Sequence, residues 1–197
     1  MKIPKTWGDI TIGQFQKLHS VQHGIYDFNF EKEIAVLSVL TNHTQDELES
    51  MPKTKVIELA RATDFINQPL SEKLNSTFKI GRRRFKVLLE AEKISAEQFI
   101  LLNRYTANDA NSIENLHYIL AVLTNEHEFF RKIHSFDHDF EAKAKLFQDK
   151  LSIEKAFAPS VFFCEVYKQW LNATETYLLK KANKIIQQTK QELMDLM

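Results

Sequence analysis

The chain has 197 residues, of which 26 are Lys or Arg and 26 are Asp or Glu, so its formal net charge at neutral pH is zero. It contains 4 Gly, 4 Pro and 1 Cys, and 44% of its residues are hydrophobic. This composition is typical of a globular protein with a substantial core, and it excludes collagen-like, low-complexity and disulfide-framework classes. Because Gly and Pro are scarce, it favours helices, and a zero net charge provides no overall field that would attract nucleic acid.

The expected compartment follows from the N-terminus, the hydropathy and the single cysteine. The N-terminus lacks the apolar segment of a signal peptide, and no run approaches the roughly 20 apolar residues that cross a bilayer. Cys164 follows Phe163 in a helical pattern, and a free Cys usually packs as a small hydrophobe. We therefore expect a protein of the reducing cytoplasm that makes no contact with a membrane.

Residues 1–70 have the periodicity of a helical half. Thr11 is a favoured N-cap residue, and Thr44 with Glu47 matches a capping box. Breakers separate the expected helices, because Gly and Pro end helical segments. These helices are a segment from Thr11 to His23-Gly24, residues 28–41, a short helix over Leu48 that ends at Met51-Pro52, and residues 54–66, with Pro69 closing the block.

Residues 71–91 change character. Two apolar pairs alternate with basic residues on either side of Gly81: Phe78 and Ile80, then Phe85 and Val87. This period of two around a glycine predicts a β-hairpin. Because a lone hairpin is marginal in water, we expect it to pack against helices and to bridge two helical halves.

Helical periodicity resumes in residues 92–158. Ser95 and Ser112 are expected to cap two helices, and Asp139 to open a third over residues 140–151. Pro159 is expected to open a long C-terminal helix near Ser160, because proline is tolerated in the first turn of a helix. This last helix is expected to run to about Met194 without an internal breaker.

The two helical halves contain matching segments. Residues 10–18 and 94–102 both follow the pattern I-[S/T]-x-x-Q-F-x-x-L, and residues 36–42 match residues 119–125 at nearly the same offset. Two matches in the same order favour a duplicated helix-pair unit, the alternative being convergence of capped amphipathic helices. The predicted fold is mainly α, in one compact domain with four parts: a first helical half (1–70), a β-hairpin bridge (71–91), a related second half (92–158) and a long helix that packs across them (159–197).

Arg82, Arg83 and Arg84 form a basic tip on the predicted hairpin and are the candidate anion-binding residues. Such a tip suits phosphate, RNA or an acidic protein surface. Adjacent strand residues point to opposite faces, so the three side chains cannot all line one surface. The alternative interpretation is an edge strand protected by its charges against aggregation.

The sequence contains a pair of histidines at a metal-binding spacing and no common catalytic motif. His134 and His138 have the spacing of a helical zinc pair, but they precede the expected helix start, and no HExxH or CxxC motif accompanies them. The phosphate-binding glycine motifs and the nucleophile motif GxSxG are absent from the sequence. We predict no enzymatic activity, no cofactor and no metal.

The C-terminal helix is the predicted partner surface. Its first part is rich in aromatic residues, which either belong to the core or face a partner. Beyond Leu179 the apolar residues continue at spacings of three and four, which is typical of a docking or coiled-coil stripe that a second copy or another protein covers. The predicted partner-binding residues are Trp170, Tyr177, Leu178, Ile185, Ile186 and Leu193.

Three short segments resemble a known group of proteins: Ile3-Pro4-x-x-Trp7-x-x-Ile10-Thr11-Ile12-Gly13-Gln14-Phe15, Asn115-Leu116-His117-x-x-Leu120-Ala121-Val122-Leu123 and Val161-Phe162-Phe163. The group comprises small helical proteins encoded among the virion-morphogenesis genes of tailed phages of Bacteroidetes, including crAss-like phages. The resemblance spans most of the chain and implies no catalytic residues.

The resemblance implies a non-enzymatic phage assembly protein of the infected host's cytoplasm, a tail-assembly chaperone or morphogenesis factor. Its expected partners are phage structural proteins of the tail or connector, together with self-association through the C-terminal helix. The alternative is a nucleic-acid-associated or structural virion protein, such as a head–tail connector or packaged internal protein, that uses the basic hairpin tip.

Overall fold

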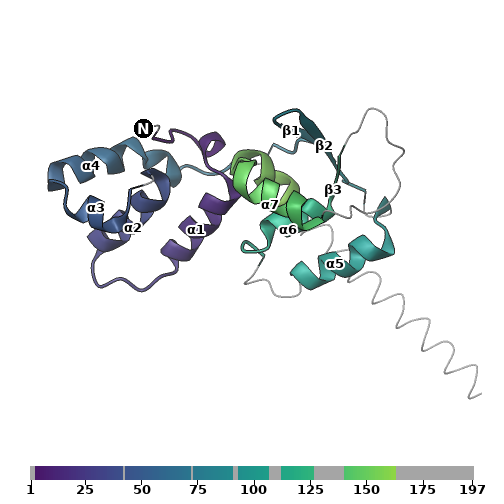
Figure 1. Cartoon of the computed structure of the whole chain (residues 1–197), viewed down its shortest axis with the longest axis horizontal. Helices are drawn as coiled ribbons and strands as arrows, with labels where there is room; N and C mark the ends of the chain where they lie inside the picture. Colours follow the sequence, from purple (N-terminus) through teal and green to yellow (C-terminus); the bar gives the residue numbers. More distant parts are fainter. Residues whose placement is uncertain are drawn as a thin grey trace, which may run out of the picture. The chain divides into compact units, whose positions relative to one another are not determined.

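The computed structural model describes residues 3–41, 43–71, 73–90, 93–106, 112–126 and 140–162 (Figure 1). The chain separates into two compact units, residues 1–161 and 162–197. The helices and strands given below lie in the first unit. The residues predicted to bind a partner lie outside the described residues: Trp170, Tyr177, Leu178, Ile185, Ile186 and Leu193.

Four α-helices occupy the N-terminal part, as the sequence predicts. They are α1 (Ile12–Gln22), α2 (Asn29–Thr41), α3 (Gln45–Glu49) and α4 (Lys53–Ala62), with the 3₁₀ helices η1 (Trp7–Asp9) before them and η2 (Asp64–Asn67) after them. Thr11 caps α1 and Thr44 caps α3, each in a reciprocal capping box, so both predicted N-caps are confirmed. A small core of Ile34, Leu37, Leu48 and Val56 joins α2, α3 and α4.

Helix α4 ends earlier than the periodicity predicts. The sequence favoured a helix over residues 54–66, but the α-helix stops at Ala62 and the chain tightens into η2. The Thr63 hydroxyl donates to the carbonyl oxygens of Leu59 and Ala60 at 3.3 and 3.0 Å. A threonine that bonds to the preceding turn favours a helix end over continuation.

A small antiparallel sheet follows, with strand order β1-β2-β3: β1 (Thr77–Ile80), β2 (Arg83–Val87) and β3 (Thr124–Glu126). The predicted hairpin is confirmed, with Ile80 opposite Arg83 and a two-residue loop between them. Gly81 in this loop has a φ of +58°, a conformation that side chains with a Cβ disfavour. The third strand was not predicted, because Thr124 follows a buried helix directly and three residues are too few to show alternation.

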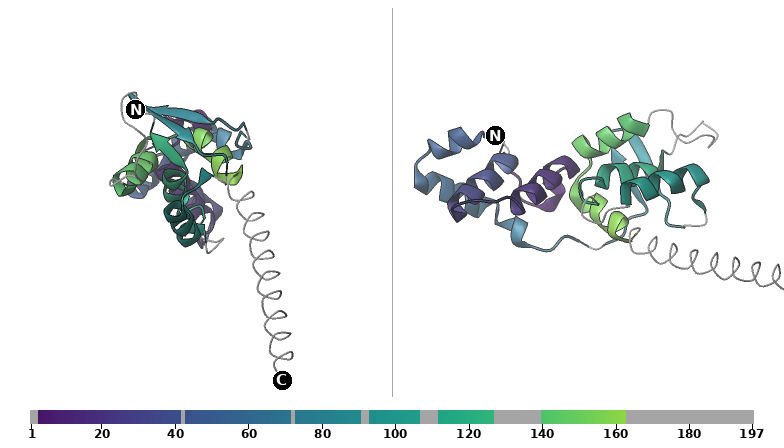
Figure 2. Two further views of the ribbon diagram at one scale, coloured as in Figure 1. Left: turned by 90° about the vertical axis from the view of Figure 1, so that its right-hand side faces the viewer. Right: turned by 90° about the horizontal axis from the view of Figure 1, so that it is seen from below.

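The inner face of the sheet packs on α7 (Phe140–Lys150), whose position beside the sheet is seen in Figures 1 and 2. Phe85 stacks on Phe78 with ring centroids 5.5 Å apart, and it meets Phe147 of α7 edge-on at 4.8 Å. Phe85 and Phe147 are fully buried. Ala144 and Phe147 are on the inner face of α7, and both belong to the main core.

Two more helices follow the hairpin in the chain: α5 (Ala96–Thr106) and α6 (Leu116–Val122). Ser95 caps α5 as predicted, but the prediction that Ser112 caps the next helix was wrong, because residues 112–115 form a turn and Asn115 is the N-cap. The Asn115 amide donates to the carbonyl oxygen of Tyr105 at 3.1 Å. This contact holds the turn against the end of α5, which sequence periodicity does not reveal.

The expectation that Pro159 opens a helix was also wrong. Residues 153–162 are helical, so the helix is already formed when the chain reaches Pro159. The Ser152 carbonyl accepts bonds from the N–H groups of Lys155 and Ala156, which places the helix start at Ser152. Pro159 has no N–H to donate to the carbonyl four residues earlier, yet the surrounding helix continues.

A two-stranded bridge links the start of α1 to the start of this helix. Thr11 pairs with Ser152 in an isolated antiparallel bridge. The Ile12 N–H donates to the Leu151 carbonyl at 3.0 Å, and the Ile153 N–H donates to the Ile10 carbonyl at 2.8 Å. Segments far apart in sequence therefore share one hydrogen-bonded contact inside the main core.

The protein is thus mainly helical with a small three-stranded antiparallel sheet. The main core joins residues of α1, α2, the sheet, α6 and α7, including Leu18, Leu40, Phe85, Leu120 and Phe147. In the part of the chain that the structure describes, none of the helices combines the length and the apolar character needed to span a bilayer.

Candidate functional site

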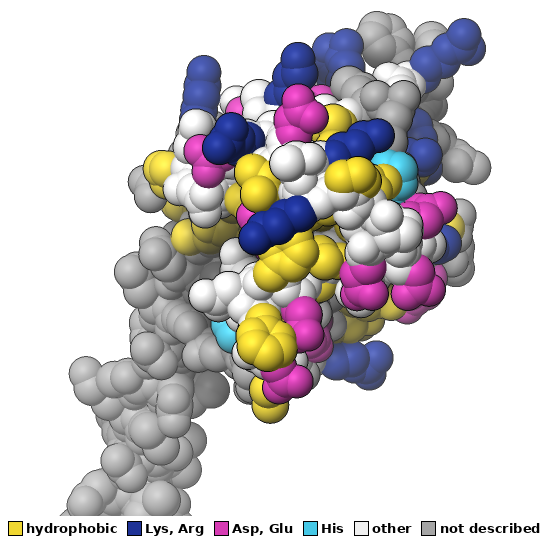
Figure 3. Space-filling model, turned by 90° about the vertical axis from the view of Figure 1, so that its left-hand side faces the viewer, with side chains coloured by type: hydrophobic (Ala, Val, Ile, Leu, Met, Phe, Trp, Pro, Cys, Tyr) yellow, Lys and Arg dark blue, Asp and Glu magenta, His cyan; other side chains and the backbone are white. Residues whose placement is uncertain are grey.

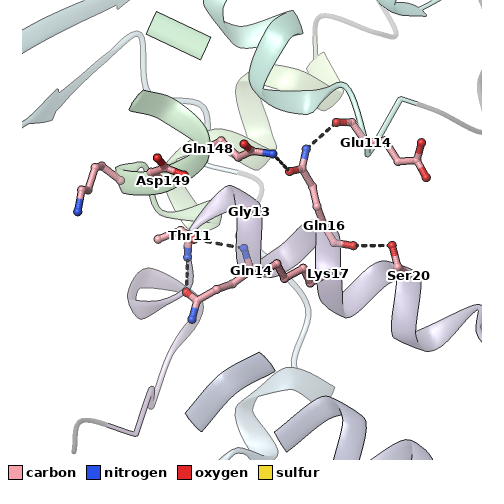
Figure 4. Close-up of a pocket in the computed structure, with 10 residues that line it drawn as sticks. Thr11, Gly13, Gln14, Gln16, Lys17, Ser20, Glu114, Gln148 and Asp149 are labelled. Atoms are coloured by element: carbon pink, nitrogen blue, oxygen red, sulfur yellow. Dashed lines mark hydrogen bonds between the residues drawn. The ribbon is translucent and has the colours of Figure 1, made fainter. Parts of the chain in front are cut away.

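A polar hollow of about 740 Å³ lies between α1 and α7 (Figure 4). Gly13 and Gln16 of α1 line it, together with Glu114 and with Gln148 and Asp149 of α7. A Cβ atom on Gly13 would lie 3.1 Å from the Gln148 carbonyl oxygen. A glycine at this position therefore allows α1 and α7 to approach closely beside the hollow.

Gln16 is the centre of the polar contacts at this hollow. Its Nε2 donates to the carbonyl oxygens of Ile113 and Glu114 at 3.0 and 2.7 Å and lies 3.0 Å from His117 Nδ1. Its Oε1 accepts from Gln148 Nε2 at 2.9 Å, which Figure 4 shows. Since Gln16 and His117 are both buried, these bonds satisfy polar groups that would otherwise cost free energy.

Sequence analysis did not identify this cluster. A usable signal existed, because Gln16 lies one helical turn after the buried Ile12, and His117 interrupts the apolar run from Leu116 to Leu123. Polar residues at expected core positions indicate a buried hydrogen-bond network. Gln148, which donates to Gln16, lies far along the chain, so the sequence offers no way to identify it as a partner.

Burial lowers the pKa of His117 below its usual value of 6.5. Glu141 and Asp149 raise this pKa and Lys145 lowers it, but burial is the largest cause. His117 Nδ1 lies beside the amide N–H donors of Gln16 and can accept a hydrogen bond from them only when it carries no proton. In the charged imidazole both ring nitrogens are donors, so this contact disfavours the charged form.

We predict that this histidine makes folding stability dependent on pH. Because the folded-state pKa is lowered, the unfolded state binds more protons as pH falls below about 6.5, and stability is lost from there down to the folded pKa. Chemical denaturation between pH 7.5 and 5.5 is expected to show this loss, and His117→Gln is expected to flatten it. Burial also lowers the pKa of His19, so this residue contributes to the pH dependence of stability as well. His19→Gln is therefore the control that separates the contribution of His19 from that of His117. An unchanged pH profile in His117→Gln would contradict the assignment.

The three arginines of the predicted anion site do not act as a group. Arg83 forms a bidentate ion pair with Glu126 of β3, and its guanidinium carbon lies 5.3 Å from the centroid of the Phe85 ring. Arg82 lies in the hairpin loop and Arg84 on β2 opposite Lys79, and both are exposed. The ion pair therefore engages Arg83 within the sheet.

Matching hydrogen bonds occur at the start of α1 and of α5. The Gln14 N–H donates to Thr11 Oγ1 at 3.2 Å, and the Thr11 N–H donates to Gln14 Oε1 at 3.0 Å. The Gln98 N–H donates to Ser95 Oγ at 3.2 Å, and the Ser95 N–H donates to Gln98 Oε1 at 3.0 Å. Both are capping boxes in which glutamine takes the place of the more frequent glutamate.

The same two glutamines also connect each helix to its successor. Gln14 Nε2 donates to the Val39 carbonyl at 3.4 Å, and Gln98 Nε2 donates to the Val122 carbonyl at 2.8 Å. Val39 and Val122 occupy equivalent positions in the two matching sequence segments. One glutamine therefore caps the first helix and ties it to the second in each pair.

A third pair of equivalent bonds lies at the end of the second helix of each pair. Thr41 Oγ1 donates to the Leu37 carbonyl at 2.7 Å, and Thr124 Oγ1 donates to the Leu120 carbonyl at 2.8 Å. These threonines are also equivalent in the matching segments. Helix α2 continues to Thr41, whereas α6 stops at Val122 because Thr124 enters the sheet as β3.

Exposed apolar side chains gather around the loop between α1 and α2. Ile25 is 100% exposed, Phe28 is 70% exposed and Phe30 is 37% exposed. Exposed acidic residues lie among them and just after them in the chain: Asp27, Glu31 and Glu33. Figure 3, which views the molecule from the side of α3 and α4, shows hydrophobic side chains at the surface beside acidic ones. The sequence alone did not reveal this apolar set, because exposure depends on which face of α2 packs on the core.

Among the described residues, no group of three or more His, Cys, Asp or Glu side chains is arranged to hold a metal ion. His134 and His138 lie outside those residues. Comparison of the chain with models of known protein families, with curated proteins and with solved structures found no match.

Proposed function

We propose that this protein is a non-enzymatic assembly protein that binds another protein, and that the partner is a tail or connector component of a tailed phage. The observation that supports protein binding is the exposed apolar set of Ile25, Phe28 and Phe30. Large apolar side chains exposed within six residues of one loop favour an interaction site, because burial against a partner would remove their apolar surface from water. The sequence resemblance to phage morphogenesis proteins supports the phage setting and the infected host's cytoplasm.

The chemistry around this set favours one kind of partner. Three exposed acidic residues, Asp27, Glu31 and Glu33, lie within a few residues of Phe28 and Phe30. An apolar centre with an acidic rim complements a segment that has an apolar face and basic flanks. We therefore propose that the partner presents a basic amphipathic segment to this loop.

We also propose that the helix pairs α1–α2 and α5–α6 are two copies of one duplicated unit. The pairs α1–α2 and α5–α6 have three kinds of equivalent hydrogen bond, made by Gln14 and Gln98, by the cap residues Thr11 and Ser95, and by the threonines 41 and 124. Convergence of amphipathic helices explains caps, but it does not explain why one glutamine bonds to the equivalent carbonyl of the next helix. We propose that the partner-binding loop belongs to the first copy of a duplicated unit.

Recovery of virion components from infected cells tests the function. The Ile25→Ser/Phe28→Ser variant is expected to recover the partner at least about tenfold less well than the unaltered protein, because loss of a central apolar contact costs more than about 1.4 kcal/mol of binding free energy. Mass spectrometry should identify the recovered protein as a tail or connector component.

The control for this variant is Ile100→Ser. Ile100 is 61% exposed on α5, away from the α1–α2 loop in sequence, so the substitution tests a general loss of surface hydrophobicity. Equal loss in the control, or recovery of proteins unrelated to virions, would refute the proposed function. Removal of residues 180–197 separately tests the part of the predicted C-terminal partner surface that contains Ile185, Ile186 and Leu193, and unchanged recovery would exclude that part.

A further inference from the structure

The outer face of the sheet is basic. Thr77, Lys79, Arg84 and Lys86 lie on the face opposite the buried Phe78 and Phe85, and all four are exposed. The register places Lys79 directly opposite Arg84, and Lys86 opposite Thr77. This face was not recognised from the sequence, which pointed to the tip residues instead.

In the part of the chain that the structure describes, these three cations form no ion pair. Among the described residues, no carboxylate lies within 4.0 Å of the charged nitrogens of Lys79, Arg84 or Lys86. The neighbouring strand adds Asn125, which is opposite Lys86 and uncharged. Like charges directly opposite each other on adjacent strands destabilise a sheet, and Lys79 and Arg84 are such a pair. A bound anion would reduce the repulsion between these two side chains.

Protection of an edge strand does not explain this face. Charged side chains on edge strands prevent pairing between molecules, and Lys79 on β1 fits that role. Arg84 and Lys86 lie on β2, which is paired on one side with β1 and on the other with β3. Lys86 lies in the part of β2 that is paired on both sides, so protection of an edge does not explain its charge.

The chemistry of the face favours phosphates. Its exposed residues on β1 and β2 are three cations and one threonine, with no aromatic or aliphatic side chain for a base or an apolar partner. A protein interface has an apolar centre, and single-stranded nucleic acid is held by aromatic stacking. Arg84 and Lys86 are two residues apart, so about 7 Å separates them along the strand, which spans about two phosphates of a duplex strand.

We infer that Lys79, Arg84 and Lys86 form a surface on the sheet's outer face that binds the phosphate backbone of double-stranded nucleic acid without sequence preference. This inference is independent of the protein-binding loop. It moves the anion site from the three arginines at the tip to one face of the sheet, because Arg83 is engaged by Glu126. Only Arg84 belongs to both sets.

Fluorescence anisotropy with a labelled 20-base-pair DNA duplex of mixed sequence tests the inference. For three neutralised phosphates, the logarithm of the association constant should fall with the logarithm of salt concentration at a slope of about −2.7. The affinity should therefore drop about 40-fold between 50 and 200 mM salt. The Lys79→Gln/Arg84→Gln/Lys86→Gln variant should bring this slope close to zero and abolish saturable binding at the lower salt concentration.

A matched control replaces three exposed cations of α4, in Lys53→Gln/Lys55→Gln/Arg61→Gln, and should leave affinity and slope as in the unaltered protein. The net charge of the two variants is the same, so a difference between them reports position and not overall charge. Thermal unfolding verifies that both variants fold. Equal losses in both, or no salt-dependent binding at 50 mM, would overturn the inference. Competition by polyglutamate at a lower charge concentration than by DNA would also overturn it, in favour of an acidic protein.

Discussion

Replacement of Phe85 by alanine is expected to lower the free energy of unfolding by about 3–5 kcal/mol, the usual cost of removing a fully buried aromatic ring. Phe85 is 0% exposed and contacts Phe78 of β1 and Phe147 of α7. Loss of its ring leaves a cavity between the sheet and α7 and removes contacts on both sides. For a chain of this size, the expected fall in melting temperature is roughly 6–20 °C.

Urea denaturation measures this effect, and Phe28→Ala is the matched control. Phe28 is 70% exposed, so the same chemical change should alter the free energy of unfolding by less than about 0.5 kcal/mol. Phe147→Ala should resemble Phe85→Ala, because both rings are fully buried and contact each other edge-on. If Phe85→Ala were no more destabilising than Phe28→Ala, the sheet would not pack on α7 as described.

Replacement of Gln16 by alanine is expected to cost about 1–3 kcal/mol, because it removes a buried side chain that bonds to three other segments. The carbonyl oxygens of Ile113 and Glu114 would lose their Gln16 bonds, and Gln148 Nε2 would lose its acceptor. Gln22→Ala is the control, since Gln22 is exposed at the end of the same helix.

A double-mutant cycle separates the Gln16–Gln148 contact from the other bonds of Gln16. Two residues in direct contact usually show a coupling energy of about 0.5–3 kcal/mol, whereas independent positions add within about 0.5 kcal/mol. We expect measurable coupling for Gln16→Ala with Gln148→Ala, because one amide donates to the other at 2.9 Å. Strict additivity would show that this bond does not tie α1 to α7 in solution.

Local chemistry made several elements predictable. Thr11, Thr44 and Ser95 are N-caps because a short side chain with an oxygen bonds to a backbone N–H within the same turn, an interaction contained in a few residues. The hairpin around Gly81 was predictable for the same reason, since alternation and a flexible glycine specify it locally. The errors at Ser112 and Pro159 arose where a distant segment supplies the hydrogen bond.

The candidate sites were predictable only in part. The three adjacent arginines marked the hairpin as basic, but the separation of Arg83 from Arg84 depends on Glu126, which reaches β2 only through an unpredicted third strand. The exposed Phe28 was visible as an apolar residue near a helix start, yet its exposure depends on which face of α2 packs on α3 and α4.

The sequence by itself determined the helical class, the N-caps Thr11, Thr44 and Ser95, and the hairpin, because each depends on contacts between residues a few positions apart. Only the tertiary structure decided which glutamine joins which helix, how Thr11 meets Ser152, and which face of the sheet remains basic. Those contacts join residues far apart in the chain, and the free energy that selects them comes from burial of a shared core. No local pattern specifies such partners, since many amphipathic helices bury their apolar faces equally well on different neighbours.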